Sequence, residues 1–475
     1  MADVYHIHVR PAPRWVAALL GLGAGLLAAA LLMALSPVYA LAGIAVLVAG
    51  VVALAFPHLA LYAAVASMIV FWPGTLIKSV DLALGALALM WAVVHRRSLL
   101  PPGPVLPVLA ALVGLVWVSS LRVGGEEAFK RALGYTSYIA IYWTVSTFSN
   151  SGLVVRRLIG ALLIGGVVIA VIGLIQLRFP FIGIVSFVQR FSEYSESGSL
   201  VDAQLWDGVF RIESLTGGPN LLGLSMQILL PFAFFWTIGQ TQPRLRLAGL
   251  AGLALMAAAM VLSLTRGVLV TTPLIIVPIV MARVGWRRSL PYAAAGLLVA
   301  ATAVLVWEPL RNRVASNVTE LLGGDSTQSG TWRLESFPVG LRMFGDYFWQ
   351  GAGIEQQVTL WKQYAPSDLI VLREMVLHND YLLIGIELGV VGVVLMLALL
   401  LLVWRQARFA QRHFRATKQR TLLGYAYAAE AAWLAIVADL MLYPLMHNFR
   451  YFWVLIAIIG ALGRVAADQK RVNER

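Results

Sequence analysis

The stretch HNDYLLIGIELGVVGVVLMLALLLLVW, residues 378–404, decides the fold, because its last part, 388–404, carries no charged residue. An apolar run approaching about 20 residues is long enough to cross a bilayer as a helix. Upstream lies a second apolar run, AAAGLLVAATAVLVW at 293–307, and the polar segment 308–378 separates the two. A connection of that length between spans is uncommon unless it has a function. We therefore expect a membrane protein with one large polar loop, which forms the lid and part of a site.

Composition agrees with this class. The chain is 60% hydrophobic and 12% charged, whereas soluble domains carry about 25% charged residues. A β-barrel is excluded because its strands would appear as short alternating segments. The absence of cysteine excludes disulfides, a thiolate nucleophile and cysteine-ligated metal. The net charge of +13 does not indicate a nucleic-acid partner, since much of the basic excess lies in short loops between apolar runs.

The sequence thus predicts an all-α polytopic integral membrane protein. About fourteen apolar runs are present, and one or two short early runs would suit re-entrant segments, so 12–14 transmembrane helices are expected. The runs are 15–35, 38–56, one ending near 72, 82–94, 104–121, 133–148, 158–177, 221–238, 247–264, 268–282, 292–307, 381–404, 422–442 and 451–462. The first is interpreted as a retained span, because no small-residue cleavage site follows it.

Three regions follow from these runs. Residues 1–307 hold spans one to eleven and an outer polar segment, 178–218; residues 308–378 form the large periplasmic loop; residues 379–475 hold the last spans and a basic cytoplasmic tail. Lysine and arginine on alternate loops place both termini on the cytoplasmic side. In a bacterium the membrane would be the inner membrane, with both polar segments facing the periplasm. The residues counted as cytoplasmic are Arg96, Arg97, Arg156, Arg157, Arg244, Arg246, Arg283, Arg287, Arg288, Arg405, Arg408, Arg412, Arg415, Lys418, Arg420, Arg464, Lys470, Arg471 and Arg475.

Arg266, in SLTRG, lies at the predicted outer junction of two spans with apolar sequence on both sides. A charge in such a place is costly unless it is paired or lines a wet cavity. One interpretation is an interfacial arginine whose guanidinium extends to the headgroups. The other is a cation directed at an anionic group, since the planar guanidinium binds two phosphate oxygens at once.

Arg211 precedes Gly217-Gly218-Pro219-Asn220, which opens a predicted span. Proline suits the first turn of a helix, and glycine lets the backbone approach a ligand closely. A helix N-terminus with a nearby arginine is a plausible anion site. An ordinary loop-to-helix turn with a solvated arginine explains the same pattern equally well.

His378 and Asn379 stand where the chain re-enters the membrane. A histidine there can accept a proton near physiological pH, although a lone interfacial histidine usually has no role. His447, near the last outer loop, is interpreted as such a histidine without a role. We expect no metal site, because no His/Asp/Glu cluster has ligand spacing such as HExxH.

The segment TWRLESFPVGLRMFGDYFW, residues 331–349, alternates bulky apolar residues with charges. It is typical of an amphipathic helix on a bilayer surface, which would cover a lateral opening for a lipid substrate. A structural cap over helix ends explains it equally well. The aromatic residues expected at headgroup depth are Trp332, Phe337, Phe344, Tyr347, Phe348 and Trp349.

Four of these elements, in order, resemble the O-antigen ligase and O-antigen polymerase superfamily. HNDYLLIGIELGVVG matches its signature at His378, Asn379, Gly389 and Gly392, and WRLESFPVGLRMFGDYFWQGAGIEQ resembles the stretch before it. RIESLTGGPNLLG and SLTRG resemble its arginine-containing elements. The similarity covers roughly residues 205–400, and the earlier spans match only in hydropathy.

The resemblance implies a GT-C-like membrane glycosyltransferase that takes a glycan from undecaprenyl diphosphate on the periplasmic side. The acceptor would be a sugar hydroxyl of lipid A-core, and the reaction would be inverting and independent of metal or cofactor. By resemblance, His378 is the base, while Arg211 and Arg266 bind the diphosphate. Weaker substrate-binding candidates are Arg333, Arg342, Arg373, Asn220 and Asn379. Asn379 would cap the helix or support the site.

Other functions stay open at this point. A polymerase of the same superfamily shares these elements, and the acceptor pocket that separates the two is not legible in the sequence. A polysaccharide or lipid exporter also has many spans, but its charges would lie at mid-span, where only Glu430 and Asp439 are found. A peptidoglycan polymerase also has a large outer loop and a lipid-diphosphate substrate, but the His-Asn signature favours the ligase group.

Overall fold

The computed structural model describes residues 61–62, 103–179, 205–206, 209–287, 289–290, 305, 308, 311–312, 315, 331–366 and 377–474. Side chains of 205–206, 209–210, 331–334, 448 and 473 are outside that description. The chain divides into two units, Met1–Ala63 and Ala64–Arg475. Of the first unit only the helical residues Leu61 and Tyr62 are described. The predicted spans before residue 103 and the span 292–307 lie outside the described residues, apart from 61–62 and 305.

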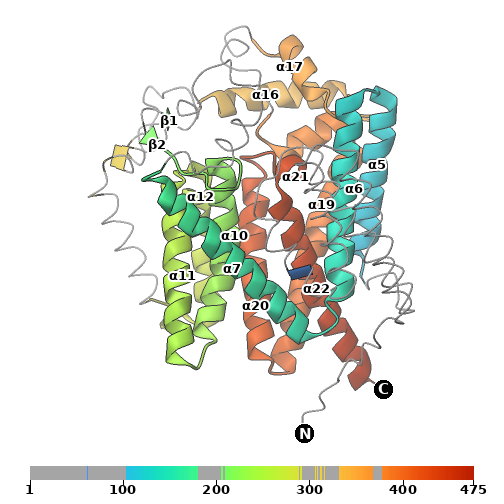
Figure 1. The fold of residues 1–475 in the computed structure, drawn as a ribbon. Helices are drawn as coiled ribbons and strands as arrows, with labels where there is room; N and C mark the ends of the chain where they lie inside the picture. The colour runs from blue at the N-terminus through green and yellow to red at the C-terminus, as the bar shows by residue number, and fades with distance from the viewer. Residues whose placement is uncertain are drawn as a thin grey trace, which may run out of the picture. The chain divides into compact units, whose positions relative to one another are not determined.

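The second unit is a bundle of long helices (Figure 1). Eight helical segments of the described part are long and apolar enough to cross a membrane, which confirms the all-α polytopic membrane class. They are α5 (Val105–Val123), α7 (Gly152–Gln176), α10 (Pro219–Ile238), α11 (Pro243–Leu262), the run Arg266–Val284, α19 (Asp380–Ala416), α20 (Arg420–Asp439) and α22 (Arg450–Asn473). The chain also forms α6 (Glu126–Phe148), α16 (Thr331–Asp346), α17 (Gln357–Tyr364) and α21 (Leu445–Asn448).

Predicted and observed helices agree closely, with differences at their ends. α6 begins at Glu126, seven residues before the expected start, and α22 continues to Asn473 instead of ending near 462. The run Arg266–Val284 comprises α12 (Arg266–Thr271), a π-helical turn η1 (Thr272–Ile276) and α13 (Val277–Val284). A two-residue strand pair, β1 (Leu205–Trp206) with β2 (Val209–Phe210), is also present.

The helices pack in a way that separates a buried centre from an apolar exterior. α22 lies between α6 and α19, while α10 packs against α11 and α20. α22 is buried over most of its length. Exposed apolar side chains of α5, α7 and α11 form a surface suited to lipid. Among them are Val118, Leu121, Ile164, Val168, Leu247 and Leu250.

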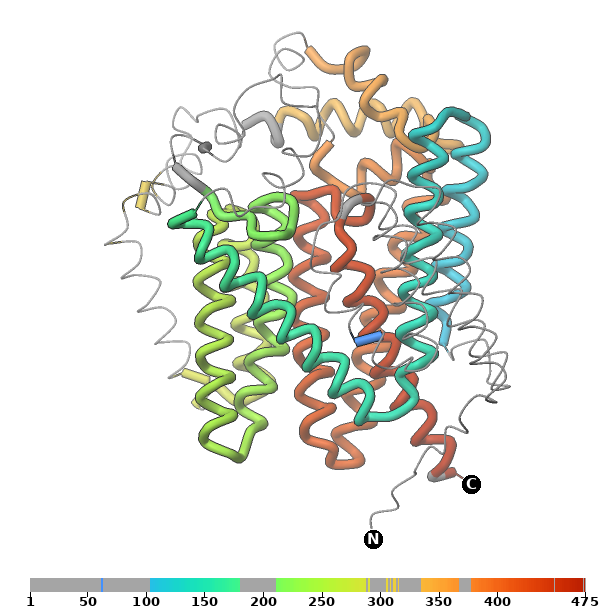
Figure 2. Tube along the Cα trace, in the orientation of Figure 1, coloured from blue at the N-terminus to red at the C-terminus, as the bar shows by residue number. Residues whose placement is uncertain are grey.

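The ends of this bundle differ in chemistry. The α10–α11 and α19–α20 turns lie at one end of the trace, and α16, α17 and the start of α19 lie at the other (Figure 2). The first end carries arginines and lysines, among them Arg244, Arg246, Lys418 and Arg420; we call it the basic end. We call the other the site end. The alternation matches the predicted pattern of basic loops, and the assignment of the basic end to the cytoplasm stays a prediction.

Candidate functional site

Arg211 is held at the site end by the start of α10. Its guanidinium Nε donates to the carbonyl of Ser263 (2.9 Å), and its Nη2 donates to Asn220 Oδ1 (2.9 Å). The residue is buried, at 9% exposure. α10 begins at Pro219 after Gly217 with φ of 82° and Gly218 with φ of 163°, so the expected helix start is confirmed. Asn220 was expected to bind substrate; in the structure its Oδ1 fixes the direction of the Arg211 guanidinium, and a contact of Asn220 with substrate stays a prediction.

The SLTRG element packs directly onto the Arg211 element. Thr265 Oγ1 donates to the carbonyl of Pro219 (3.1 Å) and lies 3.5 Å from Arg211 Nη2. Between α11 and α12, buried Leu264 adopts a φ of 50°, a left-handed conformation that is uncommon for a residue with a branched side chain. Arg266 follows as the first residue of α12 and is half-buried. Two arginine elements 55 residues apart in sequence thus form one locked unit.

His378 and Asn379 lie at the start of α19. Asn379 Oδ1 accepts from the backbone N–H of Leu382 (3.1 Å), which confirms it as the helix cap. The preceding residue, Leu377, donates its N–H to Gln357 Oε1 of α17 (2.7 Å). His378 itself is half-buried. The backbone on each side of His378 is therefore fixed by a side chain.

The turn after α20 joins the His378 element to the Arg266 element. Asp380 donates its backbone N–H to the carbonyl of Leu440 (2.8 Å). Tyr443, three residues after Leu440, packs against Gly267: a Cβ at Gly267 would lie 2.9 Å from Tyr443 Cε2. A side chain at residue 267 would therefore force these segments apart. One short turn thus contacts the residues next to both His378 and Arg266.

Gly389 of the resembling signature breaks α19, and Gly351 of the stretch before it packs the large loop against that break. Gly389 has φ of 70° inside α19, so the helix is divided into a two-turn half-helix, 380–388, and a longer part. Ala352 donates to the carbonyl of Ile386 (2.6 Å), and Val390 donates to that of Phe348 (2.7 Å). A Cβ at Gly351 would lie 2.3 Å from the Glu387 carbonyl oxygen. Glycine is thus required on both sides of this crossing.

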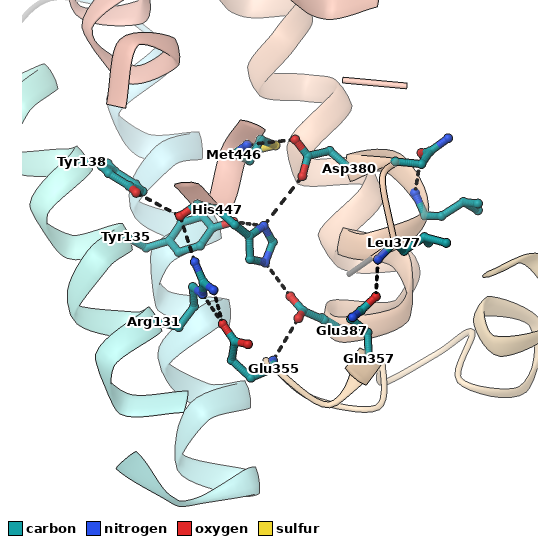
Figure 3. A network of polar contacts seen from close by, with 12 residues as sticks. Arg131, Tyr135, Tyr138, Glu355, Gln357, Leu377, Asp380, Glu387, Met446 and His447 are labelled. Atoms are coloured by element: carbon teal, nitrogen blue, oxygen red, sulfur yellow. Dashed lines mark hydrogen bonds and ion pairs between the residues drawn. The ribbon is translucent and has the colours of Figure 1, made fainter. Parts of the chain in front are cut away.

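A buried polar cluster on this half-helix corrects the interpretation of His447. The residue was expected to be an interfacial histidine without a role, yet it is only 5% exposed. Its Nε2 lies 2.7 Å from Glu387 Oε2, and its Nδ1 lies 3.7 Å from Asp380 Oδ1 (Figure 3). The partners are seven residues apart on α19 and 60 or more residues from His447 in sequence, so no local pattern indicated the cluster.

α6 closes the same cluster from the other side. Arg131 pairs with Glu355 and donates from Nη1 to the carbonyl of His447 (2.9 Å). Tyr138 Oη donates to that same carbonyl (3.1 Å), and Tyr135 Oη lies 3.3 Å from His447 Nδ1. Figure 3 shows these side chains converging on the imidazole. We call Arg131, Tyr135, Glu355, Asp380, Glu387 and His447 the histidine cluster.

The charge state of His447 follows from its neighbours. Burial lowers the pKa of His447, but the Glu387 and Asp380 carboxylates raise it, with a net pKa of about 9 against an ordinary 6.5. The imidazole is therefore an imidazolium at neutral pH, with both ring nitrogens protonated. A fully buried charge of this kind is stable only because it is paired.

The large loop meets the bundle through α16, and this corrects part of the headgroup prediction. Val339 and Met343 are buried in a cluster with Trp361, Leu377 and Ile386. Phe344 and Tyr347 pack against this cluster rather than facing outward, because the same face of α16 meets α19. Phe337 and Trp349 are exposed, and Phe348 is half-buried.

The three weaker substrate candidates of the loop have different outcomes. Arg342 is exposed on α16. Arg333 lies in α16, but its side chain is not described, and Arg373 falls outside the described residues. Nothing in the described part brings these three arginines together with Arg211, so their role stays a prediction.

The two acidic residues of α20 now have partners. Glu430 is 3% exposed and pairs with Arg283 (2.7 Å) and Arg408 (3.0 Å), and it accepts from Gln411 Nε2 (2.9 Å). Asp439, the last residue of α20, accepts from Thr271 Oγ1 (3.1 Å) next to the π-helical turn. Glu430, in the middle of α20, therefore belongs to a buried ion cluster on the side toward the basic end, whereas Asp439 lies at the site end.

Within the described ranges, no group of three or more histidine or acidic side chains could hold a metal ion. Of the site residues predicted from sequence, Arg211, Asn220 and Arg266 belong to one locked unit, and His378 and Asn379 to the half-helix joined to it. The arrangement can bind an anion through guanidinium groups and supply a proton acceptor nearby.

One region of the chain matches a known family. Residues 251–397 match the family model described as O-antigen ligase. No curated protein matches the chain. The matched region begins in α11 and contains SLTRG, the large loop and the His-Asn signature. The resemblance to the O-antigen ligase and O-antigen polymerase superfamily is thereby confirmed for this region.

Proposed function

We propose that this protein is an O-antigen ligase. It moves a glycan from undecaprenyl diphosphate to a sugar hydroxyl of lipid A-core on the periplasmic face of the inner membrane. The reaction inverts the anomeric carbon and needs no metal ion.

One observation carries this proposal. Arg211 and Arg266 belong to one locked unit, and the 440–443 turn touches both that unit and the residue after Asn379. A diphosphate bound by the two guanidinium groups would therefore lie near the end of the half-helix that carries His378. Guanidinium groups suit this anion because each donates two parallel hydrogen bonds.

The chemistry follows from these positions. The acceptor hydroxyl oxygen attacks the anomeric carbon, the bond from that carbon to the diphosphate oxygen breaks, and undecaprenyl diphosphate leaves. His378 takes the hydroxyl proton. Arg211 and Arg266 stabilise the charge that develops on the diphosphate, a role that a metal ion has in other transferases. Arg333, Arg342 and Arg373 would contact the glycan or the diphosphate from the loop.

The test is transfer by purified protein. An undecaprenyl-diphosphate glycan is incubated with and without lipid A-core, in EDTA. A single product on lipid A-core is expected, with the rate unchanged by EDTA. A ladder of lengthening glycans without lipid A-core would instead identify a polymerase. No product under either condition would contradict a transferase and return an exporter to consideration.

Topology has its own test, because the chain contains no cysteine. Single cysteines at Trp349 in the site end and Thr417 in the basic end can be labelled with a membrane-impermeant maleimide in intact cells. The proposal expects labelling at 349 only. Labelling at 417 only would reverse the orientation and contradict a periplasmic reaction.

A further inference from the structure

The half-helix 380–388 is separated from the rest of α19 by a break in the helical backbone. Asn379 caps its start and Gly389 breaks its end. Its backbone receives hydrogen bonds from Ala352 and Gly353 of the loop, at the carbonyls of Ile386 and Glu387. Two turns of helix have little stability of their own. The direction in which they present His378 must therefore be set by tertiary contacts.

The carboxylates of Asp380 and Glu387 make tertiary contacts of this kind. They are seven residues apart, so they lie on one face, two turns from each other. Both are buried, at 0% and 1% exposure. His447 is placed between them, with Nε2 2.7 Å from Glu387 and Nδ1 3.7 Å from Asp380. One imidazole therefore reaches both ends of the half-helix.

We propose that His447 is a positioning residue. As an imidazolium, it ties Asp380 to Glu387 and so fixes the half-helix that presents His378 and Asn379 to the substrates. The expected effect on transfer rests on the proposed function. The link from His447 to Asp380 and Glu387, which we call the tie, does not depend on that function.

Charge accounting supports an imidazolium rather than a neutral ring. The histidine cluster holds three carboxylates, Glu355, Asp380 and Glu387, and one guanidinium, Arg131, which pairs with Glu355. Without the second ring proton on His447, Asp380 and Glu387 would face each other across a neutral ring. Met446 helps by donating its backbone N–H to Asp380 Oδ2 (2.8 Å), and Glu355 donates its N–H to Glu387 Oε1 (2.9 Å). Both of these donors are neutral.

The tie also connects segments that do not touch the substrate elements. Arg131 and Tyr138 of α6 donate to the His447 carbonyl, and Tyr138 stacks on Trp453 of α22, with ring centroids 4.8 Å apart. The titratable and charged groups facing His447 in the described part are those of the histidine cluster and Tyr138. α6 and α22 thus hold α21, and α21 reaches the half-helix through the His447 side chain and the Met446 N–H.

The experiment compares His447→Gln with a matched control, His413→Gln, at the basic end, where His413 Nε2 lies 3.1 Å from Gln469 Oε1. Hydrogen exchange of the full-length protein in lipid nanodiscs follows residues 377–388. We expect His447→Gln to raise exchange there tenfold or more and leave the α19–α20 turn unchanged. We expect kcat for transfer to fall at least tenfold, with KM for the donor within threefold. His413→Gln should change none of these.

A double variant tests the charge itself. His447→Gln with Glu387→Gln replaces the ion pair by two amides, so exchange and kcat should recover partly relative to the single variant. Wild-type exchange at 377–388 in His447→Gln, or a double variant no better than the single one, would overturn the proposal. The exchange result does not require transfer, so an inactive wild-type protein would contradict the proposed function without deciding the tie.

If His447→Gln fails to fold, with exchange raised throughout the bundle, Glu387→Gln alone decides. That variant keeps an acceptor for the ring but removes the charge that raises the His447 pKa. The alkaline limit of the order at 377–388, expected near pH 9 in the wild type, should then move down by at least one pH unit. An unmoved limit would overturn the proposal.

Discussion

Two buried ion clusters in the described part of the bundle differ in a way that separates stability from function. At the basic end, Glu430 is matched by Arg283 and Arg408, two guanidinium groups that stay charged at every ordinary pH. At the site end, Asp380 and Glu387 depend on His447, which loses its proton in an accessible pH range. The first cluster therefore contains no cation that titrates near neutral pH, whereas the second, in the proposed role of His447, would release a half-helix beside His378 at alkaline pH.

The largest expected effect lies outside both clusters, in the locked unit that the half-helix adjoins. Arg211→Lys and Arg266→Lys keep a positive charge but lose the planar fork, so transfer should fall by about 10²–10³-fold. Binding of undecaprenyl diphosphate in nanodiscs should weaken in parallel. Arg412→Lys, exposed at the basic end, is the control. Equal transfer by all three variants would remove the arginines from donor binding.

The Glu430→Ala variant tests the basic-end cluster of Glu430, Arg283 and Arg408. Removing one partner of a buried ion pair costs about 3–5 kcal/mol, so the melting temperature in detergent should drop by several degrees. The value of kcat per folded molecule should stay at the wild-type level, because the cluster lies at the opposite end from His378. A loss of kcat without a loss of stability would mean that this cluster acts in transfer and not in stability.

The site-end cluster should respond to pH. A pKa raised from 6.5 to about 9 in the folded state gives stability that is fully present below about pH 6.5 and is lost as pH rises through about 9. The effect is a few kcal/mol at most. Chemical denaturation at pH 6 and pH 10 measures it, with His447→Gln as the control. An equal stability difference between wild type and His447→Gln at both pH values would contradict the paired imidazolium.

The smallest effect is expected at the helix cap. Asn379→Ala should cost about 1 kcal/mol, because the N–H of Leu382 loses its acceptor. Asn379→Asp keeps that acceptor and should be close to the wild type in melting temperature. If both variants lose transfer while melting normally, Asn379 contacts substrate and is more than a cap.

Much of the fold could be predicted from sequence because apolar length and basic loops are local signals. The starts of α10 and α19, at Pro219 and Asp380, lie within two residues of the predicted runs 221–238 and 381–404, because Gly-Pro and His-Asn interrupt an apolar run. The break at Gly389 was not predicted. It depends on Gly351 packing against the Glu387 carbonyl, and a sequence does not show which loop crosses a helix.

The site was predicted in part for a related reason. Arg211, Arg266 and His378 stood out because they border apolar runs, where charge is costly. His447 was missed because it was judged alone. The signal that could have found it is Glu387, an acid inside an apolar stretch, which requires a partner. Its partner, however, is set by how α21 packs, and only the tertiary structure provides that.

Donor binding and glycan transfer are assigned to different residues of the site, and one measurement tests both assignments. His378→Ala is loaded with a radiolabelled undecaprenyl-diphosphate glycan in nanodiscs, and lipid A-core is then added in a single turnover. We expect donor binding by His378→Ala to stay within about threefold of the wild type, while transfer falls by about 10²–10⁴-fold. Transfer at the wild-type rate would contradict His378 as the base, and loss of donor binding would assign His378 to the donor site instead.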